Sequence, residues 1–285
     1  MHLTATISSA HASSSIAVSA ASEVGMVRAI NEDSFLVSGP VFLVADGMGG
    51  HNAGDQASQA VRSTFGSAFS ANVPASTDEV LDAIRRSNAA VRAIEPPEGS
   101  PPAISGTTLA GIALVEAADS GMLHWMAFNI GDSRIYAWDG RTLIQLSVDH
   151  SAVQELVEAG VITGEEAMEH PDRNIITRAI GASEAVDADV WLLPATSSQA
   201  FVMCSDGLTK EIGDEQIGRI LAEHIGVEGG PTLADELVGA ALVAGGRDNV
   251  TVVVVESFTT GIGSDEEDTI ERVSFAATEI TQPRS

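Results

Sequence analysis

Four aspartates stand at the ends of short apolar runs, each beside a glycine or an asparagine. They are Asp46 in VFLVADGMGG, Asp132 in FNIGDSR, Asp206 in FVMCSDGL and Asp248 in GGRDNVTVVVV. A short apolar run is typical of a buried strand, so each carboxylate is expected at the rim of a hydrophobic sheet. Taken singly, such aspartates usually form turns or cap helices. If the four converge, their charges repel one another, and a hard divalent cation with oxygen ligands relieves that repulsion.

A second group of charged residues precedes the first aspartate. Arg28 lies four residues before Glu32, and Glu32 is followed by Asp33, in a segment with few other basic residues. An arginine beside an acidic metal cluster suggests a second anion, and the planar guanidinium suits a phosphate. Gly47 has no side chain, so its carbonyl can approach an ion that Asp46 already holds. The pattern therefore predicts a centre for metal and phosphate.

Composition limits the class of protein. The chain has 285 residues, 44% hydrophobic and 19% charged, which is enough for one substantial core. Fourteen basic against forty acidic residues give a formal net charge of −26, which disfavours nucleic acid and anionic membranes as partners. The single cysteine, Cys204, lies in an apolar run and is expected to be a buried hydrophobe rather than a nucleophile. With no signal peptide and no long apolar span, the predicted location is the cytoplasm.

Three regions are expected along the chain. Residues 1–15 are small and polar and predict a flexible extension, residues 16–258 the folded domain, and residues 259–285 a flexible acidic tail. Within the domain, strand patterns across Gly39-Pro40 predict a hairpin, and Thr77 and Ser151 are candidate helix caps. Runs of strands alternate with pairs of helices, which favours an α+β fold with two antiparallel sheets packed face to face and helices outside.

Eight segments, in order, carry a resemblance to a known family. They are Arg28 with Asn31-Glu32-Asp33, VADGMGGHNAG, Ser105-Gly106-Thr107-Thr108, NIGDSRIY, DHS at 149–151, HPDRNIITRAIG, CSDGL and GGRDNVTVVVV. Over residues 16–258 the chain resembles the metal-dependent serine/threonine protein phosphatases of the 2C type (the PPM family) in their bacterial form. The resemblance implies a four-layer αββα sandwich with two Mn²⁺ or Mg²⁺ ions in the cleft between the sheets.

The resemblance also implies metal-binding roles, position by position. Asp46 would bridge the two ions, and the Gly47 carbonyl would bind one of them. Asp206 and Asp248 would complete the other ion. Glu32 would hold the ion on the Gly47 side, directly or through water. Asp132 with Asp206 would bind a third, weaker ion.

Three further residues receive roles in the reaction. Asp33 would orient a metal-bound water, Arg28 would clamp the phosphate, and His51 would protonate the leaving alcohol. The family hydrolyses phosphoserine and phosphothreonine by direct attack of a water or hydroxide that bridges the ions, without a covalent intermediate. Residues 152–175 correspond to a flap beside the active site.

Phosphorylated proteins are the expected partners, with a bacterial Ser/Thr kinase as a candidate, and the chain is expected to be a monomer. Two alternatives stay open from the sequence. One is a catalytically silent module that binds phosphoproteins. The other is a phosphatase dedicated to a single regulatory phosphoprotein, such as an anti-sigma factor antagonist.

Overall fold

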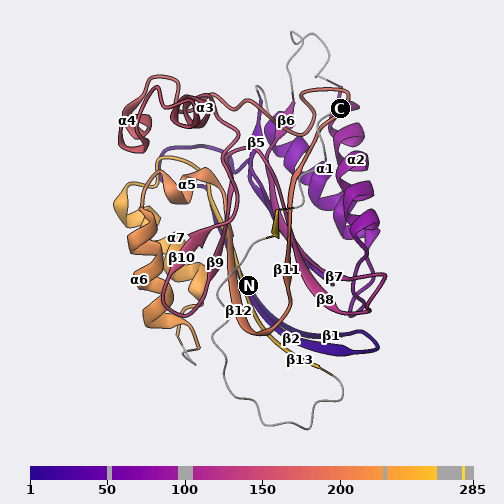
Figure 1. Ribbon diagram of the computed structural model, residues 1–285. Coiled ribbons are helices and arrows are strands. Elements are labelled where there is room, and N and C mark those ends of the chain that lie inside the picture. The colour runs from indigo at the N-terminus through magenta and orange to yellow at the C-terminus, as the bar shows by residue number, and fades with distance from the viewer. Residues whose placement is uncertain (50–52, 96–104, 227–229, 262–277, 280–285) are drawn as a thin grey trace.

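Two six-stranded antiparallel sheets pack face to face in the computed structural model, which describes residues 1–49, 53–95, 105–226, 230–261 and 278–279 (Figure 1). The first sheet has the order β1 (His2–Ser8), β2 (Ala12–Glu23), β13 (Val250–Gly261), β12 (Ser197–Cys204), β9 (Arg134–Trp138), β10 (Leu143–Gln145). The second has the order β14 (Thr278–Glu279), β11 (Asp189–Pro194), β8 (Leu123–Ile130), β7 (Leu109–Glu116), β4 (Val41–Ala45), β3 (Ser34–Ser38). A short ribbon pairs β5 (Gly47–Met48) with β6 (Gly106–Thr107).

Helices cover the outer faces of the two sheets (Figure 1). The second sheet is covered by α1 (Ala53–Ala68) and α2 (Thr77–Arg92). The first is covered by α5 (Asp206–Thr209), α6 (Asp214–His224) and α7 (Leu233–Ala244). Two short helices, α3 (Ala152–Glu158) and α4 (Gly164–Glu169), lie at one end of the sandwich. The expected α+β sandwich of two antiparallel sheets flanked by helices is confirmed.

Strand periodicity explains the layers. Along β13, Val253 and Val255 face the core between the sheets, whereas Val252 and Val254 face the core beneath the helices. An uninterrupted apolar strand is therefore buried on both faces. Between the sheets, the Trp125 ring lies 6.3 Å from Phe42 and 5.5 Å from Phe201, centroid to centroid, and so joins residues of both sheets.

One of the two predicted helix caps is confirmed. Ser151 caps α3, because its side chain accepts a hydrogen bond from the backbone N–H of Gln154. The second helix of the chain is capped one residue earlier than expected. Ser76, not Thr77, is the N-cap of α2, and it forms a capping box with Glu79.

The expected extension over residues 1–15 is wrong for this structure. His2–Ser8 form β1, which pairs along its whole length with β2, and β2 itself begins at Ala12. Ile7 is fully buried, and the Met1 ammonium donates a hydrogen bond to the Ala20 carbonyl at 2.7 Å. Within β1, Leu3, Ala5 and Ile7 alternate with exposed polar residues, which is the pattern of a half-buried strand.

The C-terminal boundary also differs from the expected one. The last long strand, β13, continues to Gly261, beyond residue 258, and Thr278–Glu279 pair with β11 as β14. The remainder of the expected acidic tail lies outside the described residues. No helix in the described part of the chain is long and apolar enough to span a membrane.

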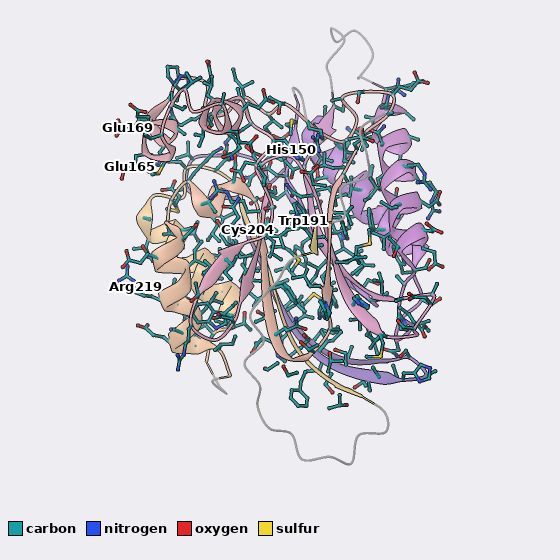
Figure 2. All side chains as sticks on the ribbon, viewed as in Figure 1. His150, Glu165, Glu169, Trp191, Cys204 and Arg219 are labelled. Atoms are coloured by element: carbon teal, nitrogen blue, oxygen red, sulfur yellow. The ribbon has the colours of Figure 1, made fainter. Side chains whose placement is uncertain are left out.

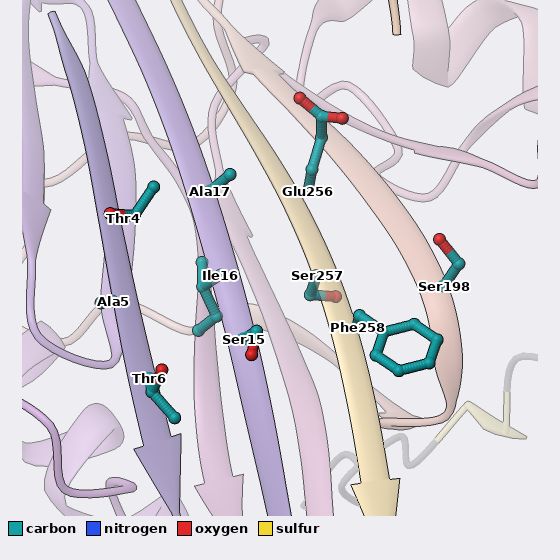
Figure 3. A pocket seen from close by; sticks show the side chains of 10 residues that line it. All are labelled: Thr4, Ala5, Thr6, Ser15, Ile16, Ala17, Ser198, Glu256, Ser257 and Phe258. Atoms are coloured by element: carbon teal, nitrogen blue, oxygen red, sulfur yellow. The ribbon is translucent and has the colours of Figure 1, made fainter. Parts of the chain in front are cut away.

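The helices leave part of the outer face of the first sheet uncovered. A hollow of about 570 Å³ lies there, with Glu256 and Phe258 of β13 beside Ala17 of β2 (Figure 3). Phe258 is eight residues beyond Val250, where β13 begins, which corresponds to roughly 25 Å of strand. None of the predicted site residues lines this hollow.

Candidate metal centre and active site

The four aspartates come together at one end of the sandwich. Asp46 follows β4 directly, Asp132 and Asp206 each lie two residues past the ends of β8 and β12, and Asp248 lies two residues before β13. Because β12 and β13 are antiparallel, the end of one lies beside the start of the other, and this brings Asp206 and Asp248 together. Asp132, Asp206 and Asp248 line the same cavity.

Threonines of the Ser-Gly-Thr-Thr segment hold the backbone of Asp46. The Asp46 N–H donates to Thr108 Oγ1 at 2.9 Å, and its carbonyl accepts from Thr107 Oγ1 at 2.8 Å and from the Thr108 N–H at 2.9 Å. Thr108 Oγ1 in turn contacts Ser133 Oγ at 2.6 Å, beside Asp132. Two of the sequence motifs are thereby coupled through one buried hydroxyl pair.

Gly47 lies where no other residue fits. A Cβ at this position would stand 2.2 Å from the Gly54 carbonyl oxygen and 2.5 Å from the Glu32 carbonyl oxygen. The absent side chain therefore lets the Asp46–Gly47 backbone contact the first turn of α1 and the segment that carries Glu32. This close approach is required whether or not the Gly47 carbonyl also binds an ion.

Asn249 ties the Arg28–Asp33 segment to the start of β13. Its side-chain amide donates to the carbonyls of Val24 and Ile30, each at 3.0 Å, and its Oδ1 accepts from the Glu32 N–H at 2.9 Å. Arg28 and Glu32 are thus held beside Asp248 by a residue 217 positions away from Glu32. Sequence reasoning missed this role, although Asn249 follows Asp248 in the motif.

Glu32 and Asp33 occupy different environments. The Glu32 carboxylate lies at the start of α1, since a Cβ on Gly54 would stand 2.7 Å from its Oε1. Burial raises the pKa of Glu32, while Arg28 and the backbone N–H groups of Asp55 and Gly54 lower it. Asp33 is buried and accepts a hydrogen bond from Ser205 Oγ at 2.8 Å.

Burial and mutual repulsion raise the pKa values of the clustered carboxylates. Burial, together with the charges of Asp206 and Asp248, raises the pKa of Asp33 to about 7 against the lowering effect of the hydrogen bonds it accepts. The pKa of Asp132 is also raised to about 7, by burial and then by Asp206. The pKa of Asp46 rises well above its usual range because burial is reinforced by four neighbouring aspartates: Asp33, Asp206, Asp132 and Asp248. The cluster is therefore short of positive charge.

Two side chains supply part of that charge. Arg28 Nε and Nη2 each lie 2.9 Å from an oxygen of Asp248. Lys210 Nζ forms an ion pair with Asp206 Oδ2 and lies 3.6 Å from Asp248 Oδ2. Lys210 was not predicted from the sequence, although it follows Asp206 by four residues and is the only lysine of the chain.

The donor set fits a hard divalent cation. Asp33, Asp132 and Asp206 each keep a buried Oδ1 with no hydrogen-bond partner among the described residues. Unpaired buried carboxylate oxygens are costly, and oxygen ligands are those that Mn²⁺ and Mg²⁺ accept. Among the described residues, no three acidic, histidine or cysteine side chains lie close enough together to hold a metal ion. We therefore expect the carboxylates to draw together when ions bind.

Other polar candidates are structural. Arg134, a possible partner of Asp132, instead binds Asp149 through Nε and Nη2, at 2.7 Å for the closest pair, and so leaves Asp132 free for other contacts. His150 accepts from the Gly131 N–H at 3.0 Å through Nδ1, and its Nε2 lies 3.2 Å from Asp189 Oδ2. His51 lies outside the described residues, so its role as a general acid stays a prediction.

Cys204 lies on β12 within the sandwich (Figure 2). Its side chain is fully buried, and burial raises the pKa of the thiol to about 12. A thiol that stays protonated at neutral pH is not a nucleophile. The expectation of a buried hydrophobe is confirmed.

A groove runs from the carboxylates to the flap (residues 152–175). Its volume is about 1,160 Å³, and it extends from Asp132, Asp206 and Asp248 to Val157 of α3 and Met168 of α4. Met168 is 70% exposed, and Glu165 and Glu169 of the same helix also line the groove (Figure 2). If the phosphorylated side chain of a substrate lies at the carboxylates, the neighbouring residues of that substrate would therefore lie beside the flap.

Comparison with known proteins gives the family. The protein phosphatase 2C family model matches residues 27–240. The serine/threonine phosphatase stp of Listeria monocytogenes is 34% identical over 251 residues, covering 85% of this chain and 96% of that protein. The serine/threonine protein phosphatase PstP of Mycobacterium tuberculosis is 38% identical over 242 residues, covering 83% of this chain and 44% of that protein.

Solved structures agree with the sequence matches. The catalytic domain of PstP in complex with two manganese ions superposes with a TM-score of 0.69 at 34% identity, covering 85% of this chain and 98% of that one. The sandwich, the order of the motifs and these similarities point to one conclusion. The chain belongs to the protein phosphatase 2C family and is a serine/threonine protein phosphatase of the bacterial type.

Proposed function

We propose that this chain removes phosphate from phosphoserine and phosphothreonine of proteins with two Mn²⁺ or Mg²⁺ ions held at Asp46, Gly47, Asp206 and Asp248. The observation that carries the proposal is the set of buried, unpartnered carboxylate oxygens around Asp46. PstP, a similar phosphatase, is known in complex with two manganese ions, which supports the same choice of metal here. Glu32 would complete the shell on the Gly47 side.

When bound, the two ions supply a water activated near neutral pH and offset the negative charge of the phosphoryl group. The residues of the chain hold and orient the reactants. Asp33 is fixed by Ser205 through Oδ2, which leaves its buried Oδ1 free to accept a hydrogen bond from the attacking water. His51 would give a proton to the leaving alcohol.

Arg28 is suited to hold the phosphate. Its guanidinium contacts Asp248, yet 52% of its side-chain surface is exposed at the rim of the carboxylate cluster. A cation that is half exposed and already oriented at the rim can bind a second anion. We therefore assign Arg28 to phosphate binding.

The wider role follows from the same chemistry. We propose that the substrates are proteins phosphorylated by Ser/Thr kinases, that the chain acts as a monomer, and that it works in the cytoplasm. The net charge of −26 supports protein substrates over nucleic acid or anionic membrane surfaces.

Metal removal tests the proposed function. Hydrolysis of an aryl phosphate and of a phosphothreonine peptide is expected to fall to the background rate in a chelator and to return when Mn²⁺ is added back in excess. The rate of phosphate release measures both steps. Turnover that continues in the chelator would contradict the two-ion proposal. Binding of the phosphopeptide without any turnover would indicate a silent binding module instead.

Replacing Arg28 with Ala is expected to raise KM for the phosphopeptide about tenfold or more, with a smaller change in kcat. The reason is that the substitution removes a charge-assisted hydrogen bond to the bound phosphate. Steady-state kinetics at saturating Mn²⁺ give both constants. Arg85→Ala is the matched control, because Arg85 is an exposed arginine of α2 that pairs with Asp82. A loss of kcat at unchanged KM would exclude a clamping role for Arg28.

A further inference from the structure

Lys210 stands out by its placement. It is the only lysine among 285 residues, and the other thirteen basic residues are arginines. It follows α5, and its backbone N–H donates to the Asp206 carbonyl at 2.8 Å, so its position relative to Asp206 is set by one helical turn. Its ammonium reaches back to Asp206 and to Asp248. The one lysine of the chain thus lies on the carboxylate cluster.

The two oxygens of Asp206 have different partners. Oδ2 is bound by the Lys210 ammonium, whereas Oδ1 is buried without a partner among the described residues. Asp206 can therefore offer Oδ1 to an ion while Oδ2 stays with Lys210. With Oδ1 given to one of the two ions, an additional ion between Asp132 and Asp206 would have to share Oδ2 with Lys210, and it would be repelled by an ammonium whose charge also acts on Asp132.

We propose that the Lys210 ammonium is a built-in cation of this centre and takes the place of a third metal ion between Asp132 and Asp206. The proposal rests on the proposed two-ion function. It replaces the third, weaker ion that the sequence resemblance implies. The chain binds two ions, and a side chain supplies the remaining positive charge.

The chemistry of lysine suits this task. An ammonium is a compact point charge on a flexible stem, and it donates hydrogen bonds to carboxylates in several directions at once. The Lys210 side chain is 38% exposed and Asp206 13%, so the charge enters the cluster from its open side. Arg247 lines the same groove, but its guanidinium is held by Glu211 through contacts of 3.1 Å. Arg247 therefore provides a neighbouring positive charge that does not contact the aspartates.

Counting bound Mn²⁺ tests the proposal. Equilibrium dialysis with metal analysis is expected to find two ions per wild-type chain and three per Lys210→Met chain. In calorimetry, the third ion of Lys210→Met should bind about tenfold or more tightly than any third binding event of the wild type. Adding Asp132→Asn to Lys210→Met should remove the third ion and keep two. Arg247→Gln, the matched control, should bind two ions like the wild type.

A single lysine also permits a direct spectroscopic readout. Protein labelled with ¹⁵N-lysine has one Nζ site, and its NMR signal is expected to persist with the properties of an ion-paired ammonium at saturating Mg²⁺. Three ions on the wild type, two on Lys210→Met, or a Lys210 signal that becomes that of a free ammonium when Mg²⁺ binds would overturn the proposal. A wild-type chain that binds no ion at all would instead refute the two-ion function on which it rests.

Discussion

Replacing Asp46 with Asn is expected to lower kcat/KM for a phosphothreonine peptide by about a thousandfold or more. Asp46 lies at the centre of the carboxylate cluster, where four other aspartates raise its pKa. On the proposed assignment, an amide in its place would not hold two cations, so the activation of water and the neutralisation of phosphate charge would both be lost. Steady-state kinetics with added Mn²⁺ measure the loss, and calorimetry measures the ions bound.

The same substitution is expected to raise the thermal midpoint of the metal-free protein. The pKa of Asp46 in the folded state lies well above its usual value, so ionising this carboxylate opposes folding as the pH rises above the value of an unfolded aspartate. Asn carries no charge and removes that penalty at neutral pH. Lower activity together with unchanged or higher metal-free stability separates a loss of function from unfolding.

Asp82→Asn serves as the control for Asp46→Asn. Asp82 is an exposed aspartate of α2 that pairs with Arg85 and Arg86, and its replacement should change neither the kinetics nor the ions bound. If Asp46→Asn kept a substantial fraction of wild-type activity at saturating Mn²⁺, Asp46 could not be the bridging ligand.

Replacing Gly207 with Ala is expected to destabilise the fold by about 2–3 kcal/mol and to lower kcat/KM strongly. A Cβ on Gly207 would stand 1.9 Å from the Asn249 carbonyl oxygen, which is a backbone atom that cannot move aside alone. The clash pushes the start of α5 away from the start of β13, and so separates Asp206 from Asp248. Urea unfolding at a fixed metal concentration gives the stability change, and kinetics give the activity.

Gly239→Ala is the matched control for Gly207→Ala. Gly239 lies inside α7, and a Cβ added there meets no atom within 4 Å. Alanine is favoured over glycine in a helix interior, so this variant should gain about 0.5–1 kcal/mol and keep full activity. Equal effects of the two substitutions would show that the contact between Gly207 and Asn249 does not hold the site together.

Much of the fold could be predicted from local patterns. The hairpin of β3 and β4 and the two-faced burial of β13 follow from alternation and from uninterrupted apolar runs. The strand β1 was missed although Leu3, Ala5 and Ile7 alternate with polar residues, because the small and polar composition of residues 1–15 as a whole favoured a flexible extension. Strand pairing depends on the partner, which a single segment does not reveal.

Some residues of the candidate site could likewise be predicted from the sequence, and others could not. Arg28, Asp46, Asp206 and Asp248 could be selected from residue type and motif order, and the structure brings them to one end of the sandwich. Lys210 could not be selected, because a lysine four residues after an aspartate is ordinarily a solvated surface pair. The role of Lys210 depends on the burial of Asp206 and on the short distance between Lys210 and Asp248.

The sequence by itself determined the kinds of groups available: carboxylates at the ends of apolar strands, a glycine after Asp46 and Asp206, and an arginine ahead of an acidic pair. Those features are local, so residue type and spacing reveal them. Only the tertiary structure decided which carboxylate oxygens stay unpaired and which cations contact the others. Asn249 reaches back 225 positions to Val24, and Arg28 pairs with an aspartate 220 positions away. Contacts at such separations arise from the packing of the two sheets, so the balance of charge in the centre is a property of the folded chain.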